Sequence, residues 1–286
     1  MNIAFLGTGL MGAPMAERLL KNKLEVTCYN RTEKKANQLK KHGAIVKRNP
    51  AKAISENEII IVMLSDYKAV ENLLFYDGYK DYKGKTVIQM STISTDENKK
   101  LEKKINKLGG GFLEAPVLGS IPQAKDGSLF VLVGGELELA DEYSGLLSIL
   151  GEVEYIGKVG EASATKLALN QLIATETAAF SMSLGFLLKK GIDINPFMSI
   201  LRQSALYAPT FDKKLDKYIK GDFENPNFPL KHMLKDVGLI ERDLKLAGVN
   251  TEIIKAIQRL LKGGVENGLG DLDYSALYKT INPDTN

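Results

Sequence analysis

Short apolar runs alternate with amphipathic stretches through the first half of the chain. Apolar runs of strand length stand at residues 3–6, 24–29, 58–64, 86–91, 111–117, 128–134 and 153–157. Helix formers with apolar positions at helical spacing follow some of these runs, as after the glycines at 7–12 and again at 94–108. A mostly apolar run such as EIIIVML at 58–64 is typical of a parallel strand buried on both faces. The pattern predicts an α/β fold with a Rossmann doubly wound parallel sheet.

The sequence changes in character near Gly160. Residues 161–189 contain no proline, are rich in Ala, Leu and Thr, and predict one helix about 43 Å long at 1.5 Å per residue. Beyond them the pattern favours helices alone. We therefore expect a Rossmann domain over 1–160 and a C-terminal all-α domain over 161–286, joined by the long helix. Because so long an apolar helix is hard to bury in a small domain, we also expect a homo-oligomer, as a homodimer or homotetramer.

Composition excludes several classes of partner. The 38 basic and 35 acidic residues give a formal charge of +3, and no basic tract is interleaved with aromatics, so we expect no nucleic-acid partner. Cys28, His42 and His232 form no zinc-binding spacing, and no metal is expected. The chain starts without a targeting pattern, and the run at 58–64 is too short to span a bilayer. We expect a cytoplasmic protein with no membrane partner.

The segment GTGLMG at 7–12 has the context of a dinucleotide fingerprint. A strand precedes it, a helix follows it, and a second strand completes the unit within about 30 residues. In such a turn Gly7 allows the tight bend, Gly9 allows the backbone to approach a pyrophosphate, and Gly12 allows close helix–strand packing. The helix N-terminus attracts the anion. The alternative is a glycine-rich turn with no ligand; the surrounding strand and helix favour the nucleotide.

The end of the second strand indicates which dinucleotide is bound. NAD sites usually carry Asp or Glu here, whereas this chain reads Tyr29-Asn30-Arg31-Thr32. A guanidinium binds the 2′-phosphate of NADP through charge-assisted hydrogen bonds, Thr32 adds a hydroxyl donor and Asn30 is neutral. The alternative is that Arg31 is only a solvated turn residue. We expect NADP (NADPH) to be preferred over NAD.

Hydride chemistry also needs a proton donor and substrate ligands, and two loops offer the latter. The segment MSTIS at 90–94 has hydroxyls where a strand ends, although Ser91 or Ser94 could equally be a helix N-cap. The segment EAPVLGS at 114–120 offers backbone N–H groups and a hydroxyl to a carboxylate, or is an ordinary turn.

Lys166 and Asn170 lie four residues apart near the start of the long helix, hence on one helix face. The apolar neighbours of Lys166 would favour its neutral form and make it a better proton shuttle. A surface lysine lying over an apolar helix is the alternative.

Together these stretches resemble the β-hydroxyacid dehydrogenase family, which includes 3-hydroxyisobutyrate dehydrogenases and glyoxylate/succinic semialdehyde reductases. The matching pieces follow the family's order: GTGLMGAPMAERL at 7–19, MSTIS at 90–94, EAPVLGS at 114–120, GKVGEASATKLALNQ at 157–171 and NFPLKHMLKDVGL at 227–239. The resemblance implies that Lys166 is the catalytic acid and base, with Asn170 positioning the reacting group. It implies a small carboxylate-bearing semialdehyde, or its hydroxy acid, as substrate.

The resemblance, together with the glycine turn and the end of the second strand, implies two further groups of site residues. The expected substrate-binding residues are Thr92, Leu118, Gly119, Ser120, Phe228 and Asp236. The expected cofactor-binding residues are Gly7, Gly9, Leu10, Met11, Gly12, Asn30, Arg31, Thr32, Met63, Leu64, Ser65, Thr92 and Lys235.

Two departures from the family pattern stand out. Leu118 replaces a serine of many members and removes a hydroxyl, so the specificity of those members does not carry over. Leu169 replaces an asparagine of some members, while Asn170 keeps an amide on the face of Lys166. The related 6-phosphogluconate dehydrogenases have a much longer helical domain, and imine reductases lack the lysine. A non-catalytic NADP-binding interaction protein on the same fold is the alternative from another class.

Overall fold

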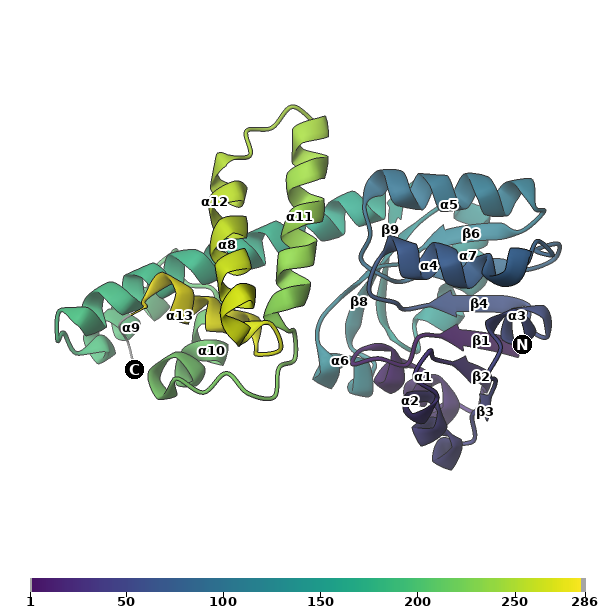
Figure 1. Ribbon diagram of the computed structural model, residues 1–286, viewed down its shortest axis with the longest axis horizontal. Coiled ribbons are helices and arrows are strands. Elements are labelled where there is room, and N and C mark those ends of the chain that lie inside the picture. Colours follow the sequence, from purple (N-terminus) through teal and green to yellow (C-terminus); the bar gives the residue numbers. More distant parts are fainter. Residues whose placement is uncertain (1, 284–286) are drawn as a thin grey trace. The chain divides into compact units, whose positions relative to one another are not determined.

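The computed structural model describes residues 2–283 of the 286-residue chain (Figure 1). The chain divides into two compact units, the first ending at Leu167 and the second beginning at Ala168. This boundary lies inside α8 (Glu161–Lys189), so one continuous helix belongs to both units.

A nine-stranded sheet forms the centre of the first unit. Its strands are β1 (Asn2–Leu6), β2 (Glu25–Tyr29), β3 (Ile45–Val46), β4 (Ile59–Val62), β5 (Thr86–Gln89), β6 (Gly111–Glu114), β7 (Val117–Leu118), β8 (Leu129–Gly134) and β9 (Gly151–Gly157). The first six are parallel in the order β3-β2-β1-β4-β5-β6, which is the order of a dinucleotide-binding sheet. The predicted doubly wound parallel sheet is confirmed.

One edge of the sheet adds a feature that the apolar pattern did not show. The predicted single strand over 111–117 is broken into β6 and β7, with Ala115 and Pro116 between them. Strand β8 then runs antiparallel to both, and β9 pairs with β8 in parallel. An antiparallel edge on a mostly parallel sheet is common among doubly wound folds, and a run of apolar residues carries no sign of its direction.

Helices cover both faces of the sheet, as seen in Figure 1. They are α1 (Gly12–Lys21), α2 (Glu33–Asn37), α3 (Pro50–Ser55), α4 (Tyr67–Leu74), α5 (Thr95–Lys107), α6 (Ile121–Asp126) and α7 (Leu137–Leu147). Strand β1 contributes alternately to two cores. Ile3 and Phe5 pack in one cluster, and Ala4 and Leu6 in the other. Because successive side chains point to opposite faces, a strand buried on both sides has to be apolar throughout.

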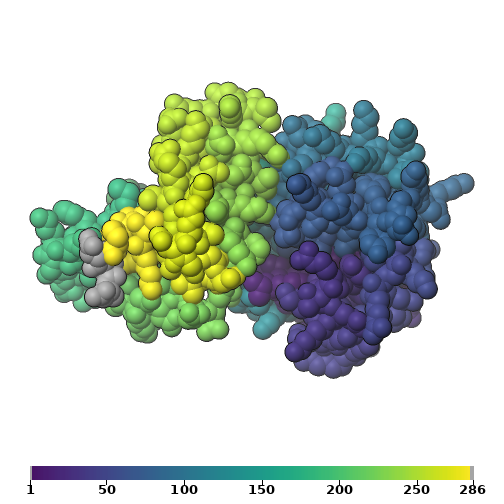
Figure 2. All heavy atoms as spheres, in the orientation of Figure 1, coloured from purple at the N-terminus to yellow at the C-terminus, as the bar shows by residue number. Residues whose placement is uncertain are grey.

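The second unit is helical in its described part. The long helix spans residues 161–189 as predicted, and α9 (Ile194–Gln203), α10 (Pro209–Lys220), α11 (Leu230–Leu246), α12 (Glu252–Gly264) and α13 (Leu277–Ile281) follow it. Its core is aromatic: Phe180 of α8 stacks on Phe211 at 4.6 Å between ring centroids and meets Tyr218 edge-on. Helices α11 and α12 pack against each other, and their atoms adjoin as the yellow-green and yellow regions of Figure 2.

Short irregular turns complete the chain. They are the 3₁₀ turns Gln38–His42, Tyr76–Gly78 and Tyr274–Ala276, and the π-type turn Val265–Leu269.

Helix α8 is, among residues 2–283, the one helix long and apolar enough to cross a membrane. Part of this helix packs into the second unit. Leu184 is fully buried, and a Cβ on Gly185 would lie 1.9 Å from the side-chain oxygen of Asn282. The Asn282 amide in turn donates to the carbonyl oxygen of Ser181 at 3.0 Å. The apolar character of α8 is therefore used, in part, to build the second unit.

Candidate active site

The three glycines of the first turn meet different surroundings. Gly7 has φ +105°, and a Cβ there would lie 2.2 Å from the carbonyl oxygen of Met63. A Cβ on Gly12 would lie 1.9 Å from the carbonyl oxygen of Gly7. A Cβ on Gly9 would meet no atom of the described chain within 4 Å. Packing therefore demands the first and third glycines, while the middle one keeps the backbone open on its outer side.

This turn fits a pyrophosphate. Helix α1 begins at Gly12 with no acidic residue in its first turn, and Met11 at its N-cap makes no side-chain hydrogen bond to the helix within the described residues. The backbone N–H groups and the positive end of the helix dipole favour an anion there. Of the two intervening residues, Leu10 is half exposed and Met11 packs against the first core. The open side of Gly9 gives the phosphates room to approach the backbone.

At the end of β2, Asn30 serves the fold directly. Its Oδ1 accepts a hydrogen bond from the backbone N–H of Thr8 at 3.1 Å, and its Nδ2 donates to the carbonyl oxygen of Thr32 at 3.0 Å. These bonds tie the glycine turn to the segment after β2. Arg31 and Thr32 are both exposed at this position. They offer the guanidinium and hydroxyl that a 2′-phosphate would need.

The carboxyl ends of β1, β4 and β5 are joined by hydrogen bonds. The N–H of Met63 donates to the carbonyl oxygen of Leu6 at 2.9 Å, and the N–H of Leu64 donates to the Ser91 hydroxyl at 2.8 Å. Ser65 follows as an exposed residue. The strand order reverses at β1 and β4, which is where doubly wound sheets bind their ligands. The predicted residues 63–65 therefore lie at the expected edge.

The hydroxyls of the 90–94 segment divide between different tasks. Ser94 is the N-cap of α5, where its hydroxyl accepts from the N–H of Glu97 at 3.3 Å and the Glu97 carboxylate accepts from the N–H of Ser94 at 2.9 Å. This capping box selects the structural alternative for Ser94. Ser91 joins two strand ends as described above. Thr92 lies between them, half-buried.

The 118–120 segment starts α6. Leu118 pairs with Phe130 across β7 and β8, and Gly119 has φ +137°, a conformation that favours glycine. Ser120 donates to the side-chain oxygen of Gln123 from both its N–H, at 3.0 Å, and its hydroxyl, at 2.7 Å. The hydroxyl proposed to hold a substrate thus also organises the first turn of a helix.

Lys166 and Asn170 lie one turn apart on α8, about 6 Å along the axis at 1.5 Å per residue. Both are almost fully buried, with exposed fractions of 6% and 7%. In the first unit, the Glu114 carboxylate accepts hydrogen bonds from the first turn of α8, two turns or less before Lys166. The sequence placed Glu114 in a loop motif and gave no sign of this contact, because its partners lie more than 45 residues away.

In the second unit, Asn170 belongs to a buried polar cluster with α11. Its Nδ2 donates to Oδ2 of Asp236 at 2.8 Å, and the ammonium of Lys235 lies 2.9 Å from Oδ1 of the same carboxylate. Two causes lower the pKa of nearby His232: burial, which is the larger, and the positive charge of the Lys235 ammonium. Phe228 precedes this helix, and its ring lies 5.8 Å from that of Tyr274. Three predicted residues, Asn170, Lys235 and Asp236, are thus brought together.

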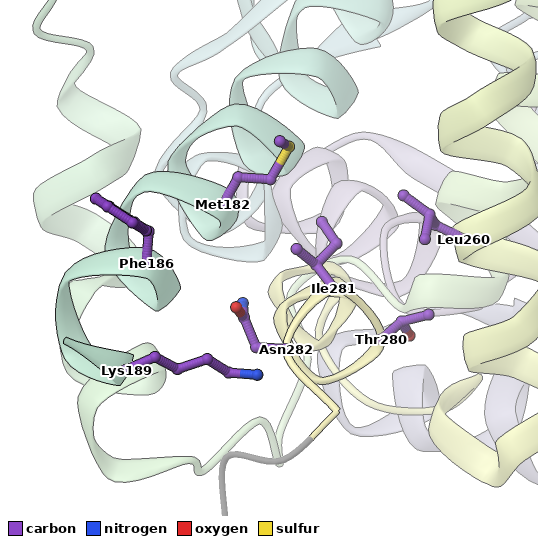
Figure 3. A pocket seen from close by; sticks show the side chains of 7 residues that line it. All are labelled: Met182, Phe186, Lys189, Leu260, Thr280, Ile281 and Asn282. Carbon is purple, nitrogen blue, oxygen red and sulfur yellow. The ribbon is translucent and has the colours of Figure 1, made fainter.

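A pocket of about 350 Å³ lies in the second unit, and Figure 3 shows the side chains that line it. The first of its lining residues along α8 is Met182, which is 16 residues or about 24 Å along the helix from Lys166. The pocket is therefore separate from the predicted catalytic residues. Its lining consists of Met182, Phe186, Lys189, Leu260, Thr280, Ile281 and Asn282. Within residues 2–283, no three His, Cys, Asp or Glu side chains are grouped to hold a metal ion.

Comparison with known proteins agrees with this geometry. Residues 2–159 match the family model of the NAD binding domain of 6-phosphogluconate dehydrogenase, and residues 160–281 match that described as NAD-binding of NADP-dependent 3-hydroxyisobutyrate dehydrogenase. Glyoxylate/succinic semialdehyde reductase 1 of Arabidopsis thaliana is 35% identical over 285 residues, 98% of each chain. The chain belongs to the β-hydroxyacid dehydrogenase family. Membership supports a pyridine-nucleotide-dependent oxidoreductase.

Two further similarities bound what the family implies. A 3-hydroxyisobutyrate dehydrogenase of Mycobacterium tuberculosis superimposes with a TM-score of 0.87 over 98% of each chain at 23% identity, which shows a common β-hydroxyacid dehydrogenase fold. The human cytokine-like nuclear factor N-PAC is 31% identical over 283 residues, which are 97% of this chain and 51% of that protein. A segment similar to this whole chain is thus about half of a larger protein, and that protein is named as a nuclear factor and not as an oxidoreductase.

Proposed function

We propose that this protein is an NADP-dependent oxidoreductase that transfers hydride between NADPH and a small semialdehyde bearing a carboxylate. Glyoxylate, succinic semialdehyde and 3-hydroxyisobutyrate-type compounds are the proposed substrates. The observation that carries the proposal is the buried pair Lys166 and Asn170, one turn apart on α8, in a chain whose glycine turn has an open side at Gly9.

Bound NADPH would supply the hydride, and the chain's own residues would manage the proton. In reduction, the Lys166 ammonium gives a proton to the carbonyl oxygen as negative charge develops on it. In oxidation the amine takes the proton back from the hydroxyl. Because Asp236 binds the Asn170 amide nitrogen, that carboxamide is held in one orientation beside the lysine's turn.

Arg31 and Thr32 support the preference for NADP over NAD. A carboxylate at this position would repel a 2′-phosphate, whereas the exposed guanidinium attracts it. For the substrate carboxylate we propose the loop of Gly119 and Ser120 together with Thr92. Leu118 offers no hydroxyl there, so the substrate preference of family members that have a serine at this position does not carry over.

We also propose that the protein is a homo-oligomer, as a dimer or tetramer, in the cytoplasm. On α8, Leu172, Met182 and Phe186 are exposed by 52%, 61% and 60%, and the last two border the pocket of Figure 3. A second copy would cover such side chains. Light scattering of the purified protein measures the subunit number.

The second candidate is a non-catalytic NADP-binding interaction protein. The similarity to a nuclear factor over nearly the whole chain favours it. A buried lysine at the head of α8 is a feature that binding alone does not require, and it favours the enzyme.

NADPH oxidation with a panel of small aldehydes tests the proposal. The panel consists of glyoxylate and four semialdehydes: succinic, methylmalonate, malonic and tartronate semialdehyde. The same assays are run with NADH in place of NADPH. Lys166→Ala should lower kcat by roughly 10²–10⁴-fold while NADPH binding stays intact. The exposed Lys190→Ala, beyond the end of α8, is the matched control and should behave as wild type.

Each outcome decides between the candidates. Turnover of a panel member that depends on Lys166 supports the reductase. Normal turnover by Lys166→Ala removes this lysine from the mechanism. Tight NADPH binding with no turnover of any compound favours the interaction protein.

A further inference from the structure

Glu114 is a fully buried carboxylate at the carboxyl end of β6. Its Oε1 accepts three backbone hydrogen bonds from the start of α8: from Gly160 at 2.7 Å, Ala162 at 2.9 Å and Ser163 at 3.2 Å. The first N–H groups of a helix have no partner within the helix, and here one side chain satisfies three of them. All four residues belong to the first unit.

The surroundings of Glu114 leave space for this contact. Its partner in the β6–β8 pairing is Gly134, and a Cβ on that glycine would lie 2.7 Å from Oε1 of Glu114. At the start of α8, Gly160 has φ +104°, which turns the chain from β9 into the helix. The sheet and the turn are thus both shaped around the carboxylate.

Charge adds to the hydrogen bonds. A carboxylate at a helix N-terminus interacts favourably with the positive end of the helix dipole. Burial raises the pKa of Glu114, and the hydrogen bonds from Ser163, Gly160 and Ala162 oppose that rise. Removing the carboxylate would leave three buried N–H groups without an acceptor, which is costly in a protein interior.

Lys166 stands close behind this contact. It follows Ser163 by three residues and Ala162 by four, so all three lie on one side of the helix. A helix transmits a shift of its first turn to the next one, because successive turns are linked by hydrogen bonds. The position of the Lys166 ammonium therefore depends on where Glu114 holds the start of α8.

We infer that Glu114 is a positioning residue for the reaction: it anchors the first turn of α8 and through it places Lys166. This inference rests on the proposed acid–base role of Lys166. It assigns Glu114 no contact with substrate or cofactor.

Three variants probe the anchor. Glu114→Leu removes the acceptor at similar size, and Glu114→Gln keeps one side-chain oxygen. Gly134→Ala pushes on the carboxylate from β8 at a position whose backbone alanine can adopt, because its φ lies outside the left-handed region. The matched control is Asn49→Ala. It removes the N-cap side chain of α3, which accepts a hydrogen bond from the N–H of Lys52 in the same unit and has no part in the site.

Amide hydrogen exchange over residues 160–166 measures the anchor independently of activity. Glu114→Leu should lose protection there, Gly134→Ala should lose part of it, and Asn49→Ala should keep it. Unchanged protection in Glu114→Leu overturns the anchor. If that variant does not fold, Gly134→Ala and Glu114→Gln decide, the former by losing protection and the latter by losing less.

A double-mutant cycle with Lys166→Ala tests the path through the lysine. In the wild-type background Glu114→Leu should lower kcat roughly 10–100-fold at unchanged KM for NADPH, the scale of an ångström-sized misplacement, and Glu114→Gln should lower it less. In the Lys166→Ala background the same change should cost less than about threefold, because the group it positions is gone. Equal losses in both backgrounds overturn the inference. Normal turnover by Lys166→Ala alone refutes the acid–base role instead, and the exchange result then stands by itself.

Discussion

Asn170 and Asp236 are joined by a buried hydrogen bond of 2.8 Å across 66 residues of sequence. The donor is an amide on α8, and the acceptor is a carboxylate on α11 that also has the Lys235 ammonium 2.9 Å away. Since both partners are almost fully buried, the bond fixes how α8 and α11 meet within the second unit. It also fixes the orientation of the amide that follows Lys166 by one turn.

Asn170→Asp should destabilise the protein in a pH-dependent way. The change places a second carboxylate beside Asp236, which raises the pKa of the pair in the folded state. Stability is then lost as pH rises through the window between the ordinary carboxyl pKa and the raised one. At pH values above that window, the free energy of unfolding of the variant should be roughly 1–3 kcal/mol lower than that of wild type. Urea unfolding at several pH values measures it; Asn170→Leu adds no carboxyl group, so its difference from wild type should change less across this window than that of Asn170→Asp.

Substitutions of the three glycines should separate folding from cofactor binding. Gly9→Ala should leave the melting temperature near that of wild type, because its Cβ meets no atom within 4 Å among the described residues. It should weaken NADPH binding about tenfold or more, a cost of about 1.4 kcal/mol. Gly12→Ala should instead destabilise the fold by roughly 1–3 kcal/mol, because its Cβ would lie 1.9 Å from a carbonyl oxygen. Calorimetry gives both quantities; equal behaviour of the two variants would contradict the division.

Arg31→Asp should weaken NADPH far more than NADH. Only NADPH has the 2′-phosphate, and a hydrogen bond to a charged group contributes about 1.5–3 kcal/mol. The exposed Arg259→Asp on α12 makes the same change of charge outside the first unit and should affect neither cofactor. Fluorescence titration with each nucleotide measures the ratio. Equal weakening of both would assign Arg31 no part in phosphate recognition.

Cys28 should be inert in the folded protein. It is the single cysteine of the chain and is fully buried in β2, where desolvation raises the pKa of its thiol to about 12. Because the thiolate is the reactive form, a thiol reagent at pH 8 should label less than one molecule in a hundred over minutes in native buffer and all of them in denaturant. Rapid labelling of the native protein would mean that β2 opens readily.

The sequence predicted regular elements well where one period ran for many residues. The bounds of α8 and the strand, turn and helix around Gly9 came from such patterns. It left Ser94 open between a site residue and a cap, since both roles use the same hydroxyl; the Glu97 partner settles the cap. The direction of β8 and the contacts of Glu114 were beyond reach, because they depend on pairing between distant segments.

The unequal surroundings of Gly7, Gly9 and Gly12 have a consequence for how the family changes over time. The first and third glycines are held by the chain's own carbonyl oxygens, so any descendant that keeps the fold must keep them. A Cβ on the middle glycine would contact no atom of the described chain, so packing does not require a glycine there. A bound nucleotide would require it, because the phosphates approach the backbone at this position. A lineage that abandoned the cofactor while retaining the domain would be free to replace that one residue. A glycine at the middle position thus indicates that a descendant still binds the nucleotide, whereas glycines at the first and third positions indicate only that it keeps the fold.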